Sequence, residues 1–315
     1  MKPHARIALQ RSAPLPVRNG VAPSRVYLPK GPWPSMYSFL AQRFPHVAEP
    51  DLRRRLLQGD IVDQAGRVVA ASDPYVSDQW LWYYREVPNE APVPFELPVL
   101  YQDDYLVAVD KPHFLASIPG GRYLNETALT RLRHALNMPS LTPLHRLDRD
   151  TAGVLLFCVH PPSRGAYQAL FQTRDVVKVY EAVAPWCDGN VWPLHFQCAM
   201  QPVPGRFTMQ AVSGSPNSET LITRVRAVSS RGSDTPLALY RLEPRTGRKH
   251  QLRVHMAALG APLLNDRFYP VLQWQQAPDD FSNPLQLLAR SVQFTDPVTG
   301  QARYFESRRR LAFDD

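Results

Sequence analysis

An acidic turn beside a long apolar segment is the feature of this chain best suited to chemistry. Residues 143–159 read PLHRLDRDTAGVLLFCV, in which Asp148 lies between Arg146 and Arg149. The run Val154 to Val159 is apolar, β-branched and aromatic, which favours a strand buried on both faces, although periodicity alone does not separate it from a helix. A carboxylate on a turn that enters a rigid buried strand is well placed for a fixed chemical role.

The same residues also have an ordinary structural explanation. A solvated turn with routine charge pairing places an Asp between two arginines, and for this segment taken alone that explanation is the better one. Gly153 then simply marks the tight entry to the strand. Two further segments reverse the preference: Glu243 to His255 reads EPRTGRKHQLRVH, and Asp175 to Ala184 reads DVVKVYEAVA.

In their order and separations, these three segments resemble the motifs of pseudouridine synthases, in the branch that modifies large-subunit ribosomal RNA and some transfer RNAs. The resemblance covers Leu97 to Phe305, and GAPLLNDRFY at Gly260 to Tyr269 looks like the closing motif of that family. The chain departs from the family pattern with Ala152 where Ser is usual, Lys249 where Thr or Ser is common, and Asn265 where Gly is usual. None of these departures removes a reactive group.

The resemblance implies a reaction that breaks the bond between uracil and ribose, rotates the base and rejoins it through carbon, without a cofactor. It assigns Asp148 as the nucleophile, which attacks either the anomeric carbon of the sugar or the uracil ring. A carboxylate must be ionised for this role, and since burial raises its pKa while a guanidinium lowers it, a cationic partner is required. The family match supplies Arg253, in HQLR, as that partner. It also supplies Tyr180, in KVY, as the tyrosine against the target base that helps to move a proton; a half-buried strand tyrosine is the alternative.

The pattern around Arg253 agrees with this assignment. Leu237 to Leu242 alternates apolar and polar residues as a strand does, and Thr246-Gly247 breaks the pattern. His250 to Leu259 has helical spacing, with Gly260 as the residue just beyond the helix end. Arg253 then lies near a helix start, where backbone amides and neighbouring cations form an anion site suited to the RNA backbone.

Several other basic or polar side chains are expected to contact RNA. His145, by its place in the HRLD motif, is also expected to order the catalytic turn. The full set of expected RNA-binding residues is His145, Arg146, Arg149, Arg245, Arg248, Lys249 and His250 near the site, with Arg53, Arg54 and Arg55 in an N-terminal module.

Two other classes of function were weighed against catalysis of this kind. A non-catalytic RNA-binding or assembly protein with the same fold would show damage at Asp148, Tyr180 or Arg253, and none is seen. A metal-dependent phosphodiesterase using Asp148 and Asp150 lacks a convincing set of ligands. His250 and His255 are five residues apart, which is poor for one helical face, so no metal is expected.

Composition favours a polyanionic partner in a reducing compartment. The chain of 315 residues has a net charge of +8 and a pI near 9.5, and residues 219–255 hold eight Arg or Lys against three acids. Such clustering is typical of phosphate contacts. The three cysteines form no disulfide or metal pattern, and neither a secretory signal nor an apolar membrane span is found. We therefore expect a cytoplasmic monomer that binds RNA.

The chain is expected to contain a small module before the catalytic domain. Residues 1–35 form a basic, proline-rich extension, read as an extended arm in which 25–28 forms a short strand. Residues 36–90, with helices at 37–44 and 49–58 followed by short strands, resemble the small RNA-binding module, first described in a ribosomal protein, that precedes some of these synthases. Gln64-Ala65 stands where that module commonly has Asn-Gly. Residues 91–98 are the linker and 99–315 the catalytic domain.

The catalytic domain is expected to be α+β. Two strands fall within 99–109, helices at 126–136 and 163–173, and further strands at 179–184, 221–228, 237–242 and 285–294. The resemblance implies a mixed, largely antiparallel sheet flanked by helices, with the catalytic cleft across its middle.

Overall fold

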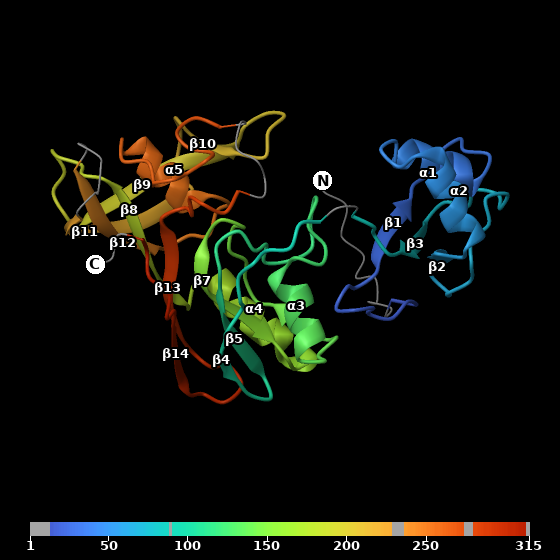
Figure 1. The fold of residues 1–315 in the computed structure, drawn as a ribbon, viewed down its shortest axis with the longest axis horizontal. Coiled ribbons are helices and arrows are strands. Elements are labelled where there is room, and N and C mark those ends of the chain that lie inside the picture. The colour runs from blue at the N-terminus through green and yellow to red at the C-terminus, as the bar shows by residue number, and fades with distance from the viewer. Residues whose placement is uncertain (1–12, 88–89, 229–235, 274–279, 313–315) are drawn as a thin grey trace. The chain divides into compact units, whose positions relative to one another are not determined.

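The chain divides into two compact units, Met1–Pro88 and Asn89–Asp315 (Figure 1). The computed structural model describes residues 13–87, 90–228, 236–273 and 280–312. Within those ranges, none of the helices is long and apolar enough to cross a membrane.

The small unit is a three-stranded antiparallel sheet with two helices packed on one face. The sheet has the order β1-β3-β2, and its elements are β1 (Ser24–Leu28), α1 (Met36–Arg43), α2 (Glu49–Leu57), β2 (Ile61–Asp63) and β3 (Gln79–Tyr83). Alternate residues of the strands, Val26 and Leu28 in β1 and Leu81 in β3, point into a core with Phe39 and Leu40 of α1. Both expected helices are confirmed. The strand expected at 25–28 is also present, and it lies inside this sheet and core, so that part of the proline-rich extension is not a separate arm.

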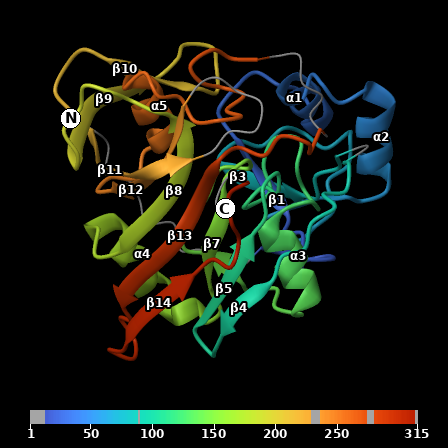
Figure 2. The same ribbon diagram turned by 60° about the vertical axis from the view of Figure 1, so that its left-hand side comes forward.

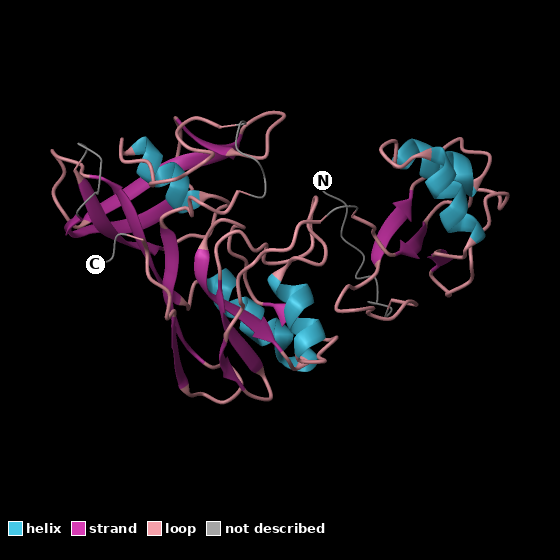
Figure 3. Cartoon of the chain, viewed as in Figure 1, coloured by secondary structure: helices cyan, strands magenta, loops and turns pink. Residues whose placement is uncertain are grey.

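The large unit is built on one long sheet, with strands in the order β10-β9-β11-β12-β8-β13-β7-β5-β4, β14 beside β13 and β6 beside β7 (Figures 2 and 3). Among the described strands, β13 and β7 form the one parallel pair. The strands are β4 (Val99–Gln102), β5 (Leu106–Lys111), β6 (Thr142–Pro143), β7 (Ala152–Cys158), β8 (Val177–Pro185), β9 (Leu194–Pro202), β10 (Met209–Val212), β11 (Ser218–Val228), β12 (Leu237–Pro244), β13 (Leu287–Thr295) and β14 (Ala302–Glu306). The expected fold class, a mixed and largely antiparallel sheet flanked by helices, is confirmed.

Helices cover both faces of the sheet. The helices are α3 (Ala128–Ala135), α4 (Arg164–Thr173) and α5 (Gln251–Ala258), with a 3-10 turn at Pro161–Ser163. The α3 side packs on Leu155 and Phe157 of β7, whereas α4 packs on Val154 and Leu156, the alternate residues of the same strand. Successive side chains of a strand point to opposite faces, so α3 and α4 lie on opposite sides of β7.

The expected strand after the acidic turn is confirmed as β7, in which every residue is buried. Its entry requires glycine because Gly153 has a φ of +113°, and an added Cβ would lie 2.2 Å from the carbonyl oxygen of Ala289 in β13. No side chain fits at that separation, so glycine permits the close approach of β7 and β13.

Candidate active site

The turn that carries Asp148 is held by buried side chains from outside it. Ser117 Oγ donates a hydrogen bond to the carbonyl oxygen of Leu147 (2.7 Å) and accepts one from the amide of the same residue (3.0 Å). Lys111 is fully buried, and its Nζ donates to the carbonyl oxygen of Arg149 (3.2 Å) and to two further carbonyls at 2.8 and 3.0 Å. Burial lowers the pKa of Lys111 to about 7. Both neighbours of Asp148 along the backbone are therefore fixed.

His145 braces the same turn against β7. Its Nε2 accepts a hydrogen bond from the amide of Leu156 (3.2 Å), and its ring stacks on Phe171 of α4 with centroids 4.9 Å apart. Burial lowers the pKa of His145 to about 3, so the imidazole is neutral at physiological pH. The side chain is thus engaged inside the protein, in agreement with an ordering role.

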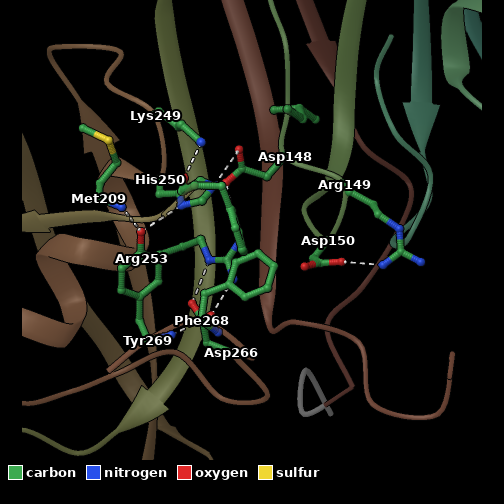
Figure 4. A network of polar contacts seen from close by, with 12 residues as sticks. Asp148, Arg149, Asp150, Met209, Lys249, His250, Arg253, Asp266, Phe268 and Tyr269 are labelled. Atoms are coloured by element: carbon green, nitrogen blue, oxygen red, sulfur yellow. Dashed lines mark hydrogen bonds and ion pairs between the residues drawn. The ribbon is translucent and has the colours of Figure 1, made fainter. Parts of the chain in front are cut away.

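Asp148 faces a guanidinium that is itself held by a second carboxylate. Arg253, 1% exposed, lies in the first turn of α5, and its Nη1 is 3.7 Å from Oδ2 of Asp148. Its Nε and Nη2 donate to Asp266 at 2.8 and 2.5 Å, a two-point pairing that fixes the plane of the guanidinium. Among the described residues Nη1 has no hydrogen-bond partner. The arginine therefore presents one free N–H edge to the Asp148 carboxylate, which is 31% exposed (Figure 4).

The electrostatics favour a permanently charged arginine at this position. Burial lowers the pKa of Arg253, but hydrogen bonding to Asp266 and the charges of Asp266 and Asp148 outweigh burial and raise it. Asp266 also accepts backbone hydrogen bonds from Phe268 (2.8 Å) and Tyr269 (3.2 Å). The Arg253 guanidinium carbon lies 4.5 Å from the centroid of the Phe268 ring, which adds a cation–π contact.

His250 approaches the other carboxylate oxygen of Asp148. Its Nε2 is 4.0 Å from Oδ1 of Asp148, and its Nδ1 is 2.8 Å from the hydroxyl of Tyr269. That hydroxyl accepts the amide proton of Met209 (2.8 Å), which leaves its own proton for Nδ1 of His250. Burial lowers the pKa of His250 to about 4, so the ring is neutral. With the Tyr269 hydroxyl as donor to Nδ1, the ring proton is on Nε2, the nitrogen that lies 4.0 Å from Asp148 (Figure 4).

Tyr180 occupies the middle of the sheet, in β8 between β12 and β13. It is opposite Leu242 of β12 and Ala289 of β13. Burial, with a smaller contribution from the charge of Asp148, raises the pKa of Tyr180, so the phenol keeps its proton at neutral pH. The structure thus brings together Asp148, Arg253 and Tyr180, the three residues expected to carry the chemistry.

The expected RNA-binding residues near the site fall into two groups. Arg146, Arg245, Arg248 and Lys249 are exposed, and Arg245 helps to line a pocket of about 300 Å³ beside the start of β8. Arg149 instead pairs with the buried Asp150 (3.1 Å), away from the Asp148 network (Figure 4). Arg149 and His250 are held within the protein. The accessible cations of the expected set are therefore Arg146, Arg245, Arg248 and Lys249.

The three arginines of α2 do not share one surface. Arg53 pairs with Glu49 at 2.9 Å, and Arg54 lies 3.3 Å from Glu86. Arg55 is 9% exposed and donates to the backbone oxygen of Tyr84. Arg55 lies on the side of α2 that faces the core of the unit. The expected RNA face of α2 therefore has two exposed arginines, Arg53 and Arg54, both next to acids.

Sequence patterns assigned no role to Asp266, which pairs with Arg253 on the side away from Asp148. The signal was present in the DRFY end of the closing motif, since a charged pair inside an apolar segment indicates a buried partner. Across the described ranges, no group of His, Cys, Asp and Glu side chains could hold a metal ion. His255 is turned away from His250, toward Ser218 at 2.8 Å.

Comparison with known proteins yields a consistent set of similarities. A family model described as RNA pseudouridylate synthase matches residues 105–258. An uncharacterized RNA pseudouridine synthase of Synechocystis is 34% identical over 236 residues, covering 74% of this chain and 79% of that protein. The dual-specificity RNA pseudouridine synthase RluA of Vibrio vulnificus is 34% identical over 207 residues, covering 63% and 78%. The human RNA pseudouridylate synthase domain containing 1 has the same fold, with a TM-score of 0.54 at 22% identity over 70% of this chain and 86% of that one.

Proposed function

Because this chain belongs to the RNA pseudouridine synthase family, we propose that it isomerises specific uridines of ribosomal RNA, and of transfer RNA as a second substrate, to pseudouridine. The reaction class follows from the family. The two RNA classes are supported by the dual-specificity name of the Vibrio vulnificus relative. The observation that carries the assignment of the site is the approach of the Arg253 Nη1 to the Asp148 carboxylate at 3.7 Å.

Asp148 is the proposed nucleophile. In the reaction the bond between C1′ of ribose and N1 of uracil breaks, a bond from C1′ to C5 forms, C5 loses its proton to solvent and N1 gains one. The Arg253 guanidinium faces the Asp148 carboxylate at 3.7 Å, and its hydrogen bonds to Asp266 hold the guanidinium in place when the substrate binds. Asp148 is partly exposed, so a base that has left its stack can reach it.

Two neighbouring groups are proposed to manage the base and its protons. Tyr180, a neutral phenol in the middle of the sheet, is suited to lie against the uracil ring and to donate or relay a proton. The Nε2 proton of His250 is aimed at the Asp148 side of the site, so this residue is proposed to donate a hydrogen bond there rather than to bind the RNA backbone. The exposed Arg146, Arg245, Arg248 and Lys249 are proposed to contact phosphates.

A tritium-release assay tests the proposed substrates. Transcripts of ribosomal RNA and of transfer RNA, labelled at C5 of every uridine, are incubated separately with the purified protein. We expect tritium release from ribosomal RNA and from transfer RNA, because the new bond from C1′ to C5 displaces the hydrogen on C5. The amount released should correspond to a few uridines in each RNA. Chemical mapping of pseudouridine then identifies the positions. Release from neither class of RNA would contradict the proposed substrates, while the family assignment would stand.

Removing the small unit separates positioning from chemistry. Truncation after residue 88 is preferable to a cut after the expected module boundary at 90, because Glu90 accepts backbone hydrogen bonds from residues 124–126 of the large unit, at 2.7 to 2.9 Å. We expect the truncated protein to keep turnover on a short model RNA and to bind structured RNA roughly tenfold more weakly, with a flatter salt dependence.

The measurement for this truncation is RNA affinity across a salt series, for both forms, with turnover on the short and the structured RNA. An unchanged salt slope together with unchanged activity on structured RNA would show that the small unit does not contact the substrate. Loss of turnover on the short RNA in a folded protein would show that the small unit helps to build the site.

A further inference from the structure

The open face of the small unit's sheet carries aromatic rings and arginines. The helices α1 and α2 cover the face formed by Val26, Leu28 and Leu81. The alternate residues of the same strands point to the opposite face of the sheet. In the antiparallel register, Arg25 is opposite Trp82 and Tyr27 is opposite Trp80. Tyr27 is 40% exposed, Arg25 is exposed and both tryptophans are partly exposed.

These side chains form a continuous set of contacts. The guanidinium carbon of Arg25 lies 4.3 Å from the Trp80 ring centroid and 5.6 Å from that of Trp82. The Tyr27 and Trp80 rings are 5.1 Å apart. The next outward position of the chain, Tyr84, has the guanidinium carbon of Arg18 at 4.3 Å. Rings and cations therefore lie against one another on this face of the sheet, where successive side chains of a strand are about 7 Å apart.

The charges of this face are available to a partner. Arg18 and Arg25 form no ion pair with any described residue, and their guanidiniums lie against aromatic rings. Asp78, beside Tyr27, already accepts hydrogen bonds from Tyr27 (2.7 Å) and Ser77 (2.9 Å). On α2, by contrast, Arg53 and Arg54 are next to acids. Among the described residues, the sheet face thus carries two arginines that are not paired with acids, in contrast to the exposed arginines of α2.

We propose that this face, made of Arg18, Arg25, Tyr27, Trp80, Trp82 and Tyr84, is a binding site for unpaired RNA, distinct from the site that holds the target uridine. Bases stack on the exposed ring faces, and the two guanidiniums pair with phosphates or stack between bases. Such stacking is tolerant of sequence because every base has a π face. A site of this kind recognises single-stranded segments that flank a folded substrate, where bases are free to stack.

The test uses the full-length protein and a fluorescently labelled oligoadenylate. This probe has no uridine, so its binding is independent of the proposed modification activity, and failure of that activity leaves the result interpretable. We expect measurable binding by fluorescence anisotropy, and a loss of roughly tenfold in affinity for Arg25→Glu and for the double variant Arg25→Ala, Trp80→Ala. Trp80→Phe, which keeps an aromatic face, should retain most of the affinity.

The matched control is the double variant Arg53→Ala, Arg54→Ala on α2. It lowers the net charge by two, as Arg25→Glu does, but on the helix side of the unit. It should change oligoadenylate affinity by less than about twofold. Arg25→Glu alters an exposed side chain, so it remains informative if the tryptophan variant unfolds, and its turnover on a short model RNA should equal that of the wild type.

Three results would overturn the proposal. One is the absence of oligoadenylate binding by the wild-type protein. Another is equal affinity in the wild type and Arg25→Glu, or a loss found in the α2 variant instead. The third is a change in molecular mass in solution for Arg25→Glu without a change in RNA affinity, which would make this face a contact between two copies of the chain.

Discussion

Asp148→Asn is expected to abolish pseudouridine formation, leaving less than about one part in a thousand of the wild-type rate. An amide oxygen has no charge to attract Arg253 and is a poor nucleophile. The change is nearly isosteric at a side chain that is 31% exposed, so the fold and most of the RNA affinity should remain. Tritium release from C5-labelled RNA measures the rate, and thermal unfolding checks the fold.

Two variants nearby provide controls for the Asp148 result. Asp150→Asn should have a much smaller effect, because the hydrogen-bonded partner of Asp150 is Arg149, at 3.1 Å, whereas Asp148 lies 3.7 Å from Arg253. Tyr180→Phe keeps the ring but loses the hydroxyl, so it should bind RNA normally and slow a proton-transfer step. Substantial turnover by Asp148→Asn would remove Asp148 as the nucleophile. Equal losses in the Asp148 and Asp150 variants would point instead to general damage of the turn.

Asp266→Asn is expected to lower the free energy of unfolding by about 3–5 kcal/mol and to reduce turnover at the same time. The substitution leaves the buried Arg253 without its two-point partner, so the guanidinium is held by the more distant Asp148 alone. The arginine should then shift toward Asp148 and lose the fixed geometry of the site. Urea unfolding gives the stability, and single-turnover kinetics on folded protein gives the rate.

A second ion pair in the same unit separates stability from catalysis. Arg303 pairs with Asp103 at 2.9 Å and with Asp296 at 3.0 Å, far along the sheet from the residues of the Asp148 network. Asp103→Asn should lower stability by a smaller amount, since Asp296 still pairs with the arginine, and leave turnover unchanged. If Asp266→Asn lost stability but kept the wild-type rate, the geometry of Arg253 would not matter for the reaction.

The sequence predicted best those parts of the fold that depend on neighbouring residues. The run at 154–159 is apolar on both sides, and β7 is buried on both faces, with α3 on one side and α4 on the other. The helix expected at 250–259 had the right spacing and a glycine just beyond its end, and α5 ends at Ala258, followed by Leu259 as C-cap and Gly260 at a φ of +77°. Strands β9, β10 and β14 were not predicted. Apolar and polar residues alternate over the first half of β9, so the pattern was present there, whereas β10 and β14 are only four and five residues long and pairing with other strands decides their state.

The candidate site could be assembled from motifs but its interactions could not. The motifs placed Asp148 and Arg253 together, whereas the stronger partner of Arg253 is Asp266, which depends on a loop returning to α5. Likewise, three consecutive arginines on α2 have the same chemistry in the sequence. Helical geometry turns Arg55 inward, and only tertiary packing decides which of the three is buried.

Gly153 has no functional group, yet it sets the spacing between the two sides of the reaction centre. Ala289 of β13 is paired with Gly153 of β7 on one side and with Tyr180 of β8 on the other. A single backbone strand is thus the spacer between the strand that follows Asp148 and the strand that holds Tyr180. Any side chain at Gly153 would wedge β7 away from β13 and carry Asp148 away from Tyr180. The distance between Asp148 and Tyr180, the proposed nucleophile and the proposed base-stacking ring, therefore depends on a residue that takes no part in the chemistry.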